Sequence, residues 1–494
     1  MRLRSLLQAS RARERRGLLV VLAVFVASRV AIALLGFHFD TRQLPHAVQN
    51  VDPELLRRHL AQSIWYLHGQ PPLWNLLEGV VLKLAPTHWG AVFHALFVVL
   101  GVVETFALYL LLRGFGLRDA VAVVLTALLV VAPATLVYEN LLFYDYPTLV
   151  LLTCAALAVQ RFVTRPTAWR AACFAAIAGA VILTRTLFQI GWLVVALAAM
   201  LALLPRARRA ILVGAALPLL VVAAVYVKNW IVFGSPTTSS WTGMGLARSV
   251  QANVPIAARE RLVREDVLHR VSLLPPLSSL AEYRAAGAAP RTKRRGIPIL
   301  DRPRKTTDAR NLHNLAYVRI SSEYLHDDLW LIRHRTGDYL RSIKLGLSRF
   351  LWPPTHAYGL RRNTNRIHAW NSVYSLVVYG STHYANRAGF VLLLAYALVV
   401  VLGLVAVLRT RRTDPRAVTL LFIWWTVVYV GVVGNLSEYG ENYRFRFVLD
   451  PLVVAALAAL PLLRTSWALS ARLRRHQAQA GVAERGHHDE VPER

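Results

Sequence analysis

Acidic residues that could act as a general base are concentrated between the first apolar run of the chain and a Pro-Pro turn. Asp40 and Asp52 are the two aspartates of this stretch, residues 38–75. An ionised carboxylate can take the proton of an attacking hydroxyl group, so either aspartate is a candidate catalytic residue. Asp52 also precedes Pro53, which is the pattern of a helix N-cap followed by proline at the first helical position. The sequence therefore supports both a chemical and a structural interpretation of Asp52.

Two other polar segments combine acidic residues with aromatic rings. The segment 138–147, YENLLFYDYP, contains Glu139 and Asp145, and the segment 437–447, SEYGENYRFRF, contains Tyr443. Rings and carboxylates together suit a sugar, whereas rings alone would form an ordinary aromatic belt at a membrane interface. We expect both segments to contribute substrate-binding residues.

Arginines near the ends of apolar runs are candidates for binding a phosphate group. They are Arg185, Arg444 and Arg446. A guanidinium group stays charged and presents five N–H donors in a planar fork that matches phosphate oxygens. The alternative is that these side chains reach toward lipid headgroups without a specific ligand. Inside the apolar runs, Arg29 and Glu104 are expected to make polar contacts between helices.

The composition is that of a membrane protein. Hydrophobic residues make up 55% of the 494 residues and the mean hydropathy is +0.41, which is too apolar for a soluble domain. The formal net charge is +30, but the arginines lie in short clusters between apolar runs rather than in one stripe or tail. This distribution fixes membrane orientation and suits contact with membrane lipids, and it argues against nucleic acid as a partner. Both cysteines lie in apolar runs and are expected to be unpaired.

The apolar runs predict an all-α polytopic membrane protein with about ten transmembrane helices. The basic N-terminus is expected to stay in the cytoplasm, so that the first helix runs outward. The run 71–84 is shorter than the roughly 20 residues that span a bilayer, and we expect a half-buried helix on the outer side. The amphipathic stretch 52–68 predicts a helix lying in the interface. The predicted spans are residues 18–37, 91–112, 120–137, 148–159, 171–184, 192–204, 211–226, 388–408, 418–433 and 448–463.

These runs divide the chain into five parts. No apolar run of spanning length occurs between residues 228 and 387, and a long loop crosses the membrane regardless of its charge. We therefore expect an outer-face domain there, largely helical, with helices over 312–334 and 337–350. The five parts are a basic cytoplasmic N-terminus (1–17), a transmembrane module (18–227) with an outer catalytic loop (38–90), the outer-face domain (228–387), the C-terminal transmembrane helices (388–463) and a disordered cytoplasmic tail (464–494).

The chain lacks the common signatures of soluble group-transfer enzymes. It has no phosphate-binding G-x-x-x-x-G-K-[ST] loop, no H-E-x-x-H motif and no convincing Cys/His spacing for a metal. An enzyme acting outside the membrane without a nucleotide site would take an activated donor that is already attached to a lipid. The arrangement resembles the GT-C glycosyltransferases, integral membrane enzymes that use polyprenyl-phosphate sugars, such as the protein O-mannosyltransferases and aminoarabinose transferases. The residues that carry the resemblance are FHFDTR, YLHGQPPLWNLLEG, YENLLFYDYP, KNWIVFGSPTTSSWTGM and GENYRFRFVLDP, in this order along the chain.

The resemblance implies roles for individual residues. It makes Asp40 the general base, with Asp52 in reserve, and it places Asp145, with Glu139 near it, in the wall of the same cavity. Some members of the family bind the lipid phosphate through a basic residue before the Pro-Pro pair. This chain instead has Gln70 at that position, with His68 two residues earlier. The arginines named above are then the candidates for binding the lipid phosphate.

The implied reaction is transfer of a sugar with inversion, on the outer face of a bacterial cell membrane. The acceptor hydroxyl, from a glycan, a lipid or a protein, would attack the anomeric carbon opposite the departing lipid phosphate. Arginines would stabilise the charge of the leaving phosphate. The family is divided on the use of a divalent cation, and no metal ligands can be assigned from the sequence.

Two other functions share these features. A transporter or flippase of lipid-linked sugars would also need arginines for the phosphate, but such proteins usually contain repeated halves with broken helices, and no internal repeat is evident here. A non-enzymatic scaffold of the cell envelope would need none of the polar clusters. Transfer of a labelled sugar distinguishes the three possibilities.

Overall fold

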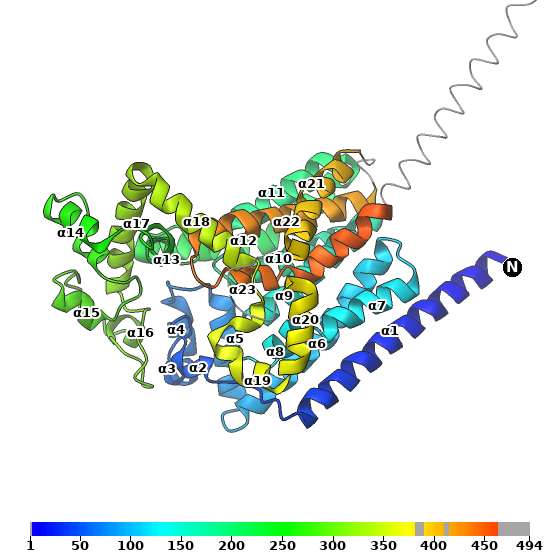
Figure 1. Cartoon of the computed structure of the whole chain (residues 1–494), viewed down its shortest axis with the longest axis horizontal. Coiled ribbons are helices and arrows are strands. Elements are labelled where there is room, and N and C mark those ends of the chain that lie inside the picture. The colour runs from blue at the N-terminus through cyan, green and yellow to red at the C-terminus, as the bar shows by residue number, and fades with distance from the viewer. Residues whose placement is uncertain (1, 381–389, 410–413, 463–494) are drawn as a thin grey trace, which may run out of the picture.

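The computed structural model describes residues 2–380, 390–409 and 414–462, and within these ranges every regular element is a helix. Extended pairing is limited to two isolated bridges in the same ranges, Asp40 with Leu141 and Arg304 with Arg310. The all-α class is therefore confirmed. The N-terminus of α1 (Arg2–Leu34) and the helices α14 (Ile256–Arg264) and α15 (Leu280–Ala285) lie at opposite ends of the molecule (Figure 1). The predicted tail, residues 464–494, lies outside the described residues.

Five helices of the described chain are long and apolar enough to cross a membrane. A sixth span is formed if α7 (Asp119–Val130) and α8 (Pro133–Glu139) are counted together, although the pair bends by 57°. Pro133 explains the break, because proline cannot donate the helical hydrogen bond and forces Ala132 into an extended conformation. The five are α1 over Ala12–Leu34, α6 (Trp89–Gly114), α9 (Asp145–Thr164), α12 (Arg208–Phe233) and α22 (Pro415–Ser437).

The prediction of about ten spans is wrong for the described residues. The helices α10 (Ala168–Thr184) and α11 (Ile190–Leu203) have 17 and 14 residues, fewer than the roughly 20 that cross a bilayer. Two further apolar helices are also short where they are described, Val391–Ala406 within α21 (Phe390–Arg409) and Asp450–Leu462. The error arose because apolar runs too short to cross a bilayer, such as 148–159 and 171–184, were counted as spans, although a run shows only that a segment avoids water.

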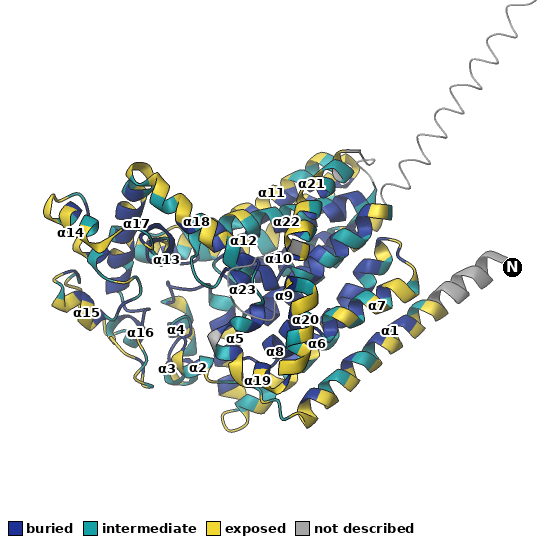
Figure 2. Cartoon of the chain, viewed as in Figure 1, coloured by how far each residue is buried: buried dark blue, intermediate teal, exposed yellow. Residues whose placement is uncertain are grey.

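The membrane character of the fold shows in where its apolar side chains lie. Buried residues gather between the long helices, and exposed ones follow the outer sides of helices such as α1 and α7 (Figure 2). On α12 the exposed side chains include Leu212, Val213 and Leu217. A surface this apolar is stable against lipid rather than water. The structure is therefore that of a helical membrane protein.

Polar contacts inside the long helices join one helix to another, as expected. Arg29 on α1 forms an ion pair with Glu139 on α8, and the Tyr146 hydroxyl donates a hydrogen bond to the same carboxylate at 2.9 Å. Glu104 on α6 accepts a hydrogen bond of 3.0 Å from Thr153 on α9. Such contacts lower the cost of polar groups in hydrocarbon, although Oε2 of Glu104 has no hydrogen-bond partner among the described residues.

The segment between α1 and α6 forms four short helices. Asp52 caps α3 as its sequence context predicted, with Pro53 at the first helical position. The single helix expected over 52–68 is broken at His59, whose backbone leaves the helical region. The short helix expected over 71–84 is present as α5. The four are α2 (Gln43–His46), α3 (Pro53–Arg58), α4 (Leu60–Trp65) and α5 (Pro72–Leu84).

The residues after α12 form a helical region with apolar clusters of its own. α12 continues past the predicted boundary at residue 228 and ends at Phe233, and the following Gly234 adopts the left-handed conformation of a helix C-cap. Two clusters of buried side chains lie within the following region, one around Tyr317 and one around Leu331. The expected helices are present as α17 and α18. The remaining principal helices of the region and of the C-terminal part are α13 (Thr242–Val250), α16 (Pro298–Asp301), α17 (Ala316–His334), α18 (Thr336–Phe350), α19 (Arg361–Arg366), α20 (His368–Tyr379) and α23 (Asn442–Phe447).

Candidate functional site

A cavity of about 420 Å³ brings together segments that are far apart in the sequence. Its walls come from the turn between α10 and α11, from residues around α13, and from the segment between α22 and α23. The charged side chains in its lining are Arg185, Arg248, Glu438, Glu441 and Arg444, and the polar ones include Gln70.

Local structure explains how the two arginines of the cavity are positioned. Arg185 directly follows α10 and has an extended backbone conformation, so its side chain leaves the helix end instead of continuing the helical surface. Arg444 lies on the short helix α23, which follows the end of α22. The end of α10 and the short helix α23 thus carry the two cations of the site.

Asp145 holds both arginines. Its Oδ1 atom lies 2.7 Å from Nη1 of Arg185, and its Oδ2 atom accepts hydrogen bonds of 3.0 and 2.7 Å from Nε and Nη2 of Arg444. Asp145 and Arg185 are 1% and 3% exposed. Buried guanidinium groups require such partners, because an unpaired charge in this environment would be strongly destabilising.

Aromatic rings fix the same two guanidinium groups from the side. The guanidinium carbon of Arg185 lies 4.8 Å from the ring centre of Phe445, and that of Arg444 lies 4.8 Å from the ring centre of Phe143. Stacking and ion pairing together hold each planar fork in one orientation. The site is therefore organised before any ligand binds.

Glu438 differs from the other carboxylates of the site. One of its oxygens accepts a hydrogen bond of 3.0 Å from Arg248, while Oε1 is buried and has no hydrogen-bond partner in the described part of the chain. Burial raises the pKa of Glu438, and the effect outweighs that of Arg248. A carboxylate that lines a cavity and has a raised pKa has the properties of a general base.

Glu441 is more exposed and more firmly ionised. Its carboxylate accepts a hydrogen bond of 2.6 Å from Nη1 of Arg444, and its side chain is 41% exposed. The positive charge of Arg444 lowers the pKa of Glu441. Because it is already bonded to an arginine, Glu441 suits the positioning of that arginine better than proton transfer.

Asp40 and Asp52 are not among the residues that line the cavity. Asp40 pairs through its backbone with Asn140 and Leu142, and its carboxylate forms an ion pair with Arg42. Burial opposes ionisation of Asp40, but the hydrogen bonds from Arg42 outweigh burial and lower its pKa.

The carboxylate of Asp52 is occupied by structural contacts. It accepts hydrogen bonds from the backbone of Glu54 at 3.1 Å and from the hydroxyl and backbone of Thr306 at 2.7 and 2.8 Å. These bonds join α3 to the loop before α17 and favour the structural interpretation of Asp52.

The other predicted substrate-binding residues have different surroundings. Gln70 lines the cavity, whereas the buried His68 bonds to Ser240 at 2.6 Å and to the carbonyl oxygen of His313 at 2.8 Å. Burial lowers the pKa of His68 to about 4, so the ring is neutral near pH 7. His68 therefore positions the segment that contributes Trp241 to the cavity. Tyr443 is 8% exposed and does not line the cavity.

Arg446 and Glu139 serve other contacts. Arg446 is 1% exposed and forms an ion pair of 2.9 Å with Asp450, and it donates a hydrogen bond to Tyr379. Glu139 pairs with Arg29 inside the helix bundle. Of the three predicted phosphate-binding arginines, the structure therefore brings Arg185 and Arg444 together at the cavity and leaves Arg446 out of its lining.

The sequence analysis did not single out the lining residues Arg248 and Trp241, and it placed Glu438 only within the segment 437–447. Trp241 lies in the motif KNWIVFGSPTTSSWTGM and Glu438 is the first acid after α22, so both had a sequence signal. The carboxylates of the site, Asp145, Glu438 and Glu441, each bond to an arginine. They do not fit a divalent cation, and the reaction proposed below uses none.

No protein-family model, no curated protein and no solved structure matches this chain. The fold and the cavity thus define its class only as a helical membrane protein with a charged, preorganised cavity.

Proposed function

We propose that the protein is a membrane glycosyltransferase that moves a sugar from a polyprenyl-phosphate donor to a cell-envelope acceptor. The observation that carries this proposal is the paired display of Arg185 and Arg444 at one cavity, held by Asp145. The motif order of GT-C glycosyltransferases supports the same function. A phosphate that links a sugar to a lipid needs guanidinium donors, and Arg185 and Arg444 both line this cavity.

The distribution of arginines supports an outer location. Arg170 lies near the start of α10 and Arg185 directly follows its end, so the two arginines mark opposite ends of that helix. The clusters around Arg113, Arg170 and Arg208 suit the cytoplasmic side by the positive-inside rule. As part of the proposal, we put Arg185 and its cavity on the outer face, at the end of α10 that lies away from Arg170.

In the proposed reaction, Arg185 and Arg444 bind the phosphate of the donor and Glu438 takes the proton of the acceptor hydroxyl. A bond forms between the acceptor oxygen and the anomeric carbon as the bond from that carbon to the phosphate oxygen breaks. The electron pair of the broken bond stays on the lipid phosphate, where the guanidinium groups stabilise it. Attack opposite the leaving group inverts the anomeric configuration.

Reconstitution in liposomes with a radiolabelled polyprenyl-phosphate sugar tests this function. We expect the label to move to an envelope acceptor, with slower transfer in Arg185→Lys. Arg170→Lys is the matched control, because Arg170 lies near the opposite end of α10 and contacts backbone carbonyl groups. Movement of the lipid across the bilayer without transfer would instead identify a flippase, and neither activity would favour a scaffold.

A further inference from the structure

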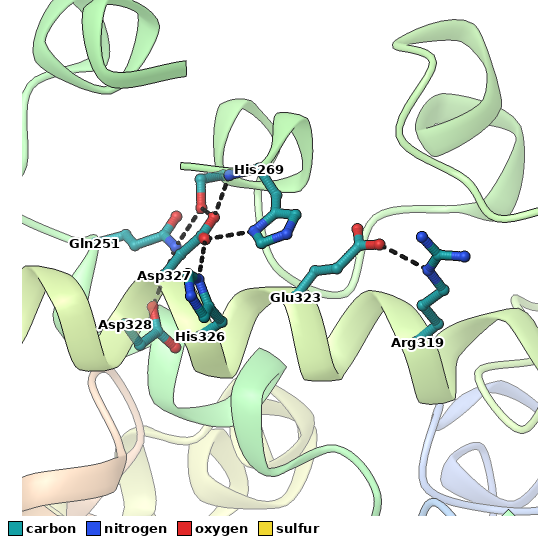
Figure 3. A network of polar contacts seen from close by, with 8 residues as sticks. Gln251, His269, Arg319, Glu323, His326, Asp327 and Asp328 are labelled. Atoms are coloured by element: carbon teal, nitrogen blue, oxygen red, sulfur yellow. Dashed lines mark hydrogen bonds and ion pairs between the residues drawn. The ribbon is translucent and has the colours of Figure 1, made fainter. Parts of the chain in front are cut away.

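A second cluster of ionisable side chains lies in the region after α12, among residues that do not line the large cavity. His326 and Asp327 are consecutive residues on α17, and His269 immediately precedes the short helix η2 (Arg270–Leu273) (Figure 3). The two imidazole rings approach the same carboxylate. Nδ1 of His269 lies 2.7 Å from Oδ1 of Asp327, and Nδ1 of His326 lies 3.4 Å from the same atom.

The geometry of this cluster fits a metal ion. One ligand atom from each residue lies within 4.8 Å of the others. A tetrahedral ion with ligands at about 2.0–2.2 Å holds those ligands roughly 3.4 Å apart. The two histidine side chains are 42% and 66% exposed, so small rotations of the rings can bring the three atoms to that spacing.

The charge of the cluster also favours a cation. Asp327 is fully buried, and within the described residues its ion-pair partners are the two histidines, which are charged only if protonated. The adjacent Asp328 is buried as well, and its Oδ2 atom has no hydrogen-bond partner in the described chain. Buried carboxylates without a permanent cation are costly, and a bound divalent ion would neutralise them.

Surrounding hydrogen bonds orient the proposed carboxylate ligand. Oδ2 of Asp327 accepts hydrogen bonds from the backbone N–H of His269 at 2.9 Å and from the Ser272 hydroxyl at 2.6 Å. This leaves Oδ1 directed toward the rings, as Figure 3 shows. Metal-binding carboxylates and imidazoles are commonly fixed by such outer contacts.

Space remains beside the cluster for a fourth ligand. Both histidines line a cavity of about 660 Å³, to which Asp266 also contributes. Three protein ligands with an open position are typical of a zinc ion that also holds water or an exchangeable group. Imidazole nitrogens select zinc or a similar transition ion over magnesium or calcium.

We propose that His269, His326 and Asp327 bind a divalent transition-metal ion, with Zn²⁺ the best fit. The ion links α17 to the segment before η2. The same network reaches α13, because Gln251, directly after α13, donates hydrogen bonds to Asp328 and Ser272 at 3.1 and 3.0 Å. Arg248 of α13 lines the large cavity, so the metal braces one of its walls.

Calorimetric titration of the full-length, chelator-treated protein with Zn²⁺ tests the site. The parent for all variants carries His487→Ala and His488→Ala, because these two adjacent histidines can bind metal themselves. We expect one saturable site in this parent, with affinity reduced at least 10-fold by His269→Gln or His326→Gln. His334→Gln is the matched control, since His334 lies on the same helix but stacks on Trp330 instead.

A second readout separates ligation from misfolding. Co²⁺ in place of Zn²⁺ should give visible absorption bands in the parent and in His334→Gln, and weaker bands in the two cluster variants. Zinc should also raise the unfolding temperature of the parent but not of those variants. Equal zinc affinity in the parent and in the His269→Gln/His326→Gln double variant would overturn the proposal, as would the absence of saturable binding. Neither outcome depends on glycosyl transfer.

Discussion

Two arginine–carboxylate clusters in this protein form the same kind of ion pair beside cavities of very different volume. Arg29 and Glu139 meet between α1 and α8, beside a space of only about 10 Å³. Arg185 and Arg444 meet Asp145 beside a cavity of about 420 Å³. The first cluster has no room for a ligand and can only join helices, whereas the second can offer its guanidinium groups to a substrate. The volume of the cavity beside a charged residue in a membrane helix thus indicates whether that residue can bind a ligand.

The largest expected effect concerns the cluster of Arg185, Arg444 and Asp145 beside the larger cavity, and its candidate base Glu438. Glu438→Gln should lower the rate of transfer by about 10²–10⁴-fold, because the amide cannot accept the proton, while donor binding is retained. Glu441→Gln is the matched control and should cost less, since that acid already bonds to Arg444. Single-turnover transfer and donor-binding assays in liposomes measure both.

Asp40→Asn decides between the two candidate bases. If Asp40 only accepts hydrogen bonds from Arg42 and takes no part in the reaction, the Asp40→Asn variant should keep most of the transfer activity. A larger loss in Asp40→Asn than in Glu438→Gln would assign the base to the residue that the GT-C resemblance implies.

Substitutions in the cluster of Arg29 and Glu139 should change the stability of the protein rather than its activity. Arg29→Met leaves the buried carboxylate of Glu139 without its cation and should destabilise the protein by about 3–5 kcal/mol. Thermal unfolding in detergent measures the loss, and the double variant Arg29→Met/Glu139→Gln should recover much of it. A normally folded Arg29→Met protein without transfer activity would instead indicate that Glu139 is a substrate-binding residue, as the sequence predicted.

A smaller effect is expected for phosphate binding. Arg185→Lys keeps the charge but loses the planar fork, so kcat/KM for the donor should fall by about 10–100-fold, or roughly 1.4–2.8 kcal/mol. Arg446→Lys should instead lower the unfolding temperature, because Arg446 bonds to Asp450 and Tyr379. If both variants lost only stability, the contrast between the clusters would disappear.

The smallest effect is a pH dependence with opposite signs for activity and stability. Burial raises the pKa of Glu438 above its ordinary value, so in the window between the two values the folded protein holds a proton that the unfolded chain has released. Raising the pH through this window should therefore increase the transfer rate, as the base ionises, and decrease stability. Rate and unfolding profiles of the wild type and Glu438→Gln, in which both trends should vanish, measure this.

The sequence was sufficient for features that depend on near neighbours. The N-cap at Asp52, the short helix after the Pro-Pro turn and the all-helical class follow from local patterns. The contact between Asp145 and Arg444 joins residues 299 positions apart, and no local pattern specifies it. The predicted number of spans was also wrong. The position of a helix end, such as the one before Arg185, depends on which tertiary contacts replace the helical hydrogen bonds.

Asp145 lies at the start of α9, whereas Arg444 lies close to the C-terminal end of the described chain. During synthesis, the early helices must therefore enter the membrane while this aspartate has only Arg185 beside it. The hydrogen bonds to its second oxygen, Oδ2, form only after the segment that contains Arg444 has been synthesised. Assembly of the cavity is then a late event in biogenesis, and a prematurely terminated chain would carry a defect that membrane quality control can detect.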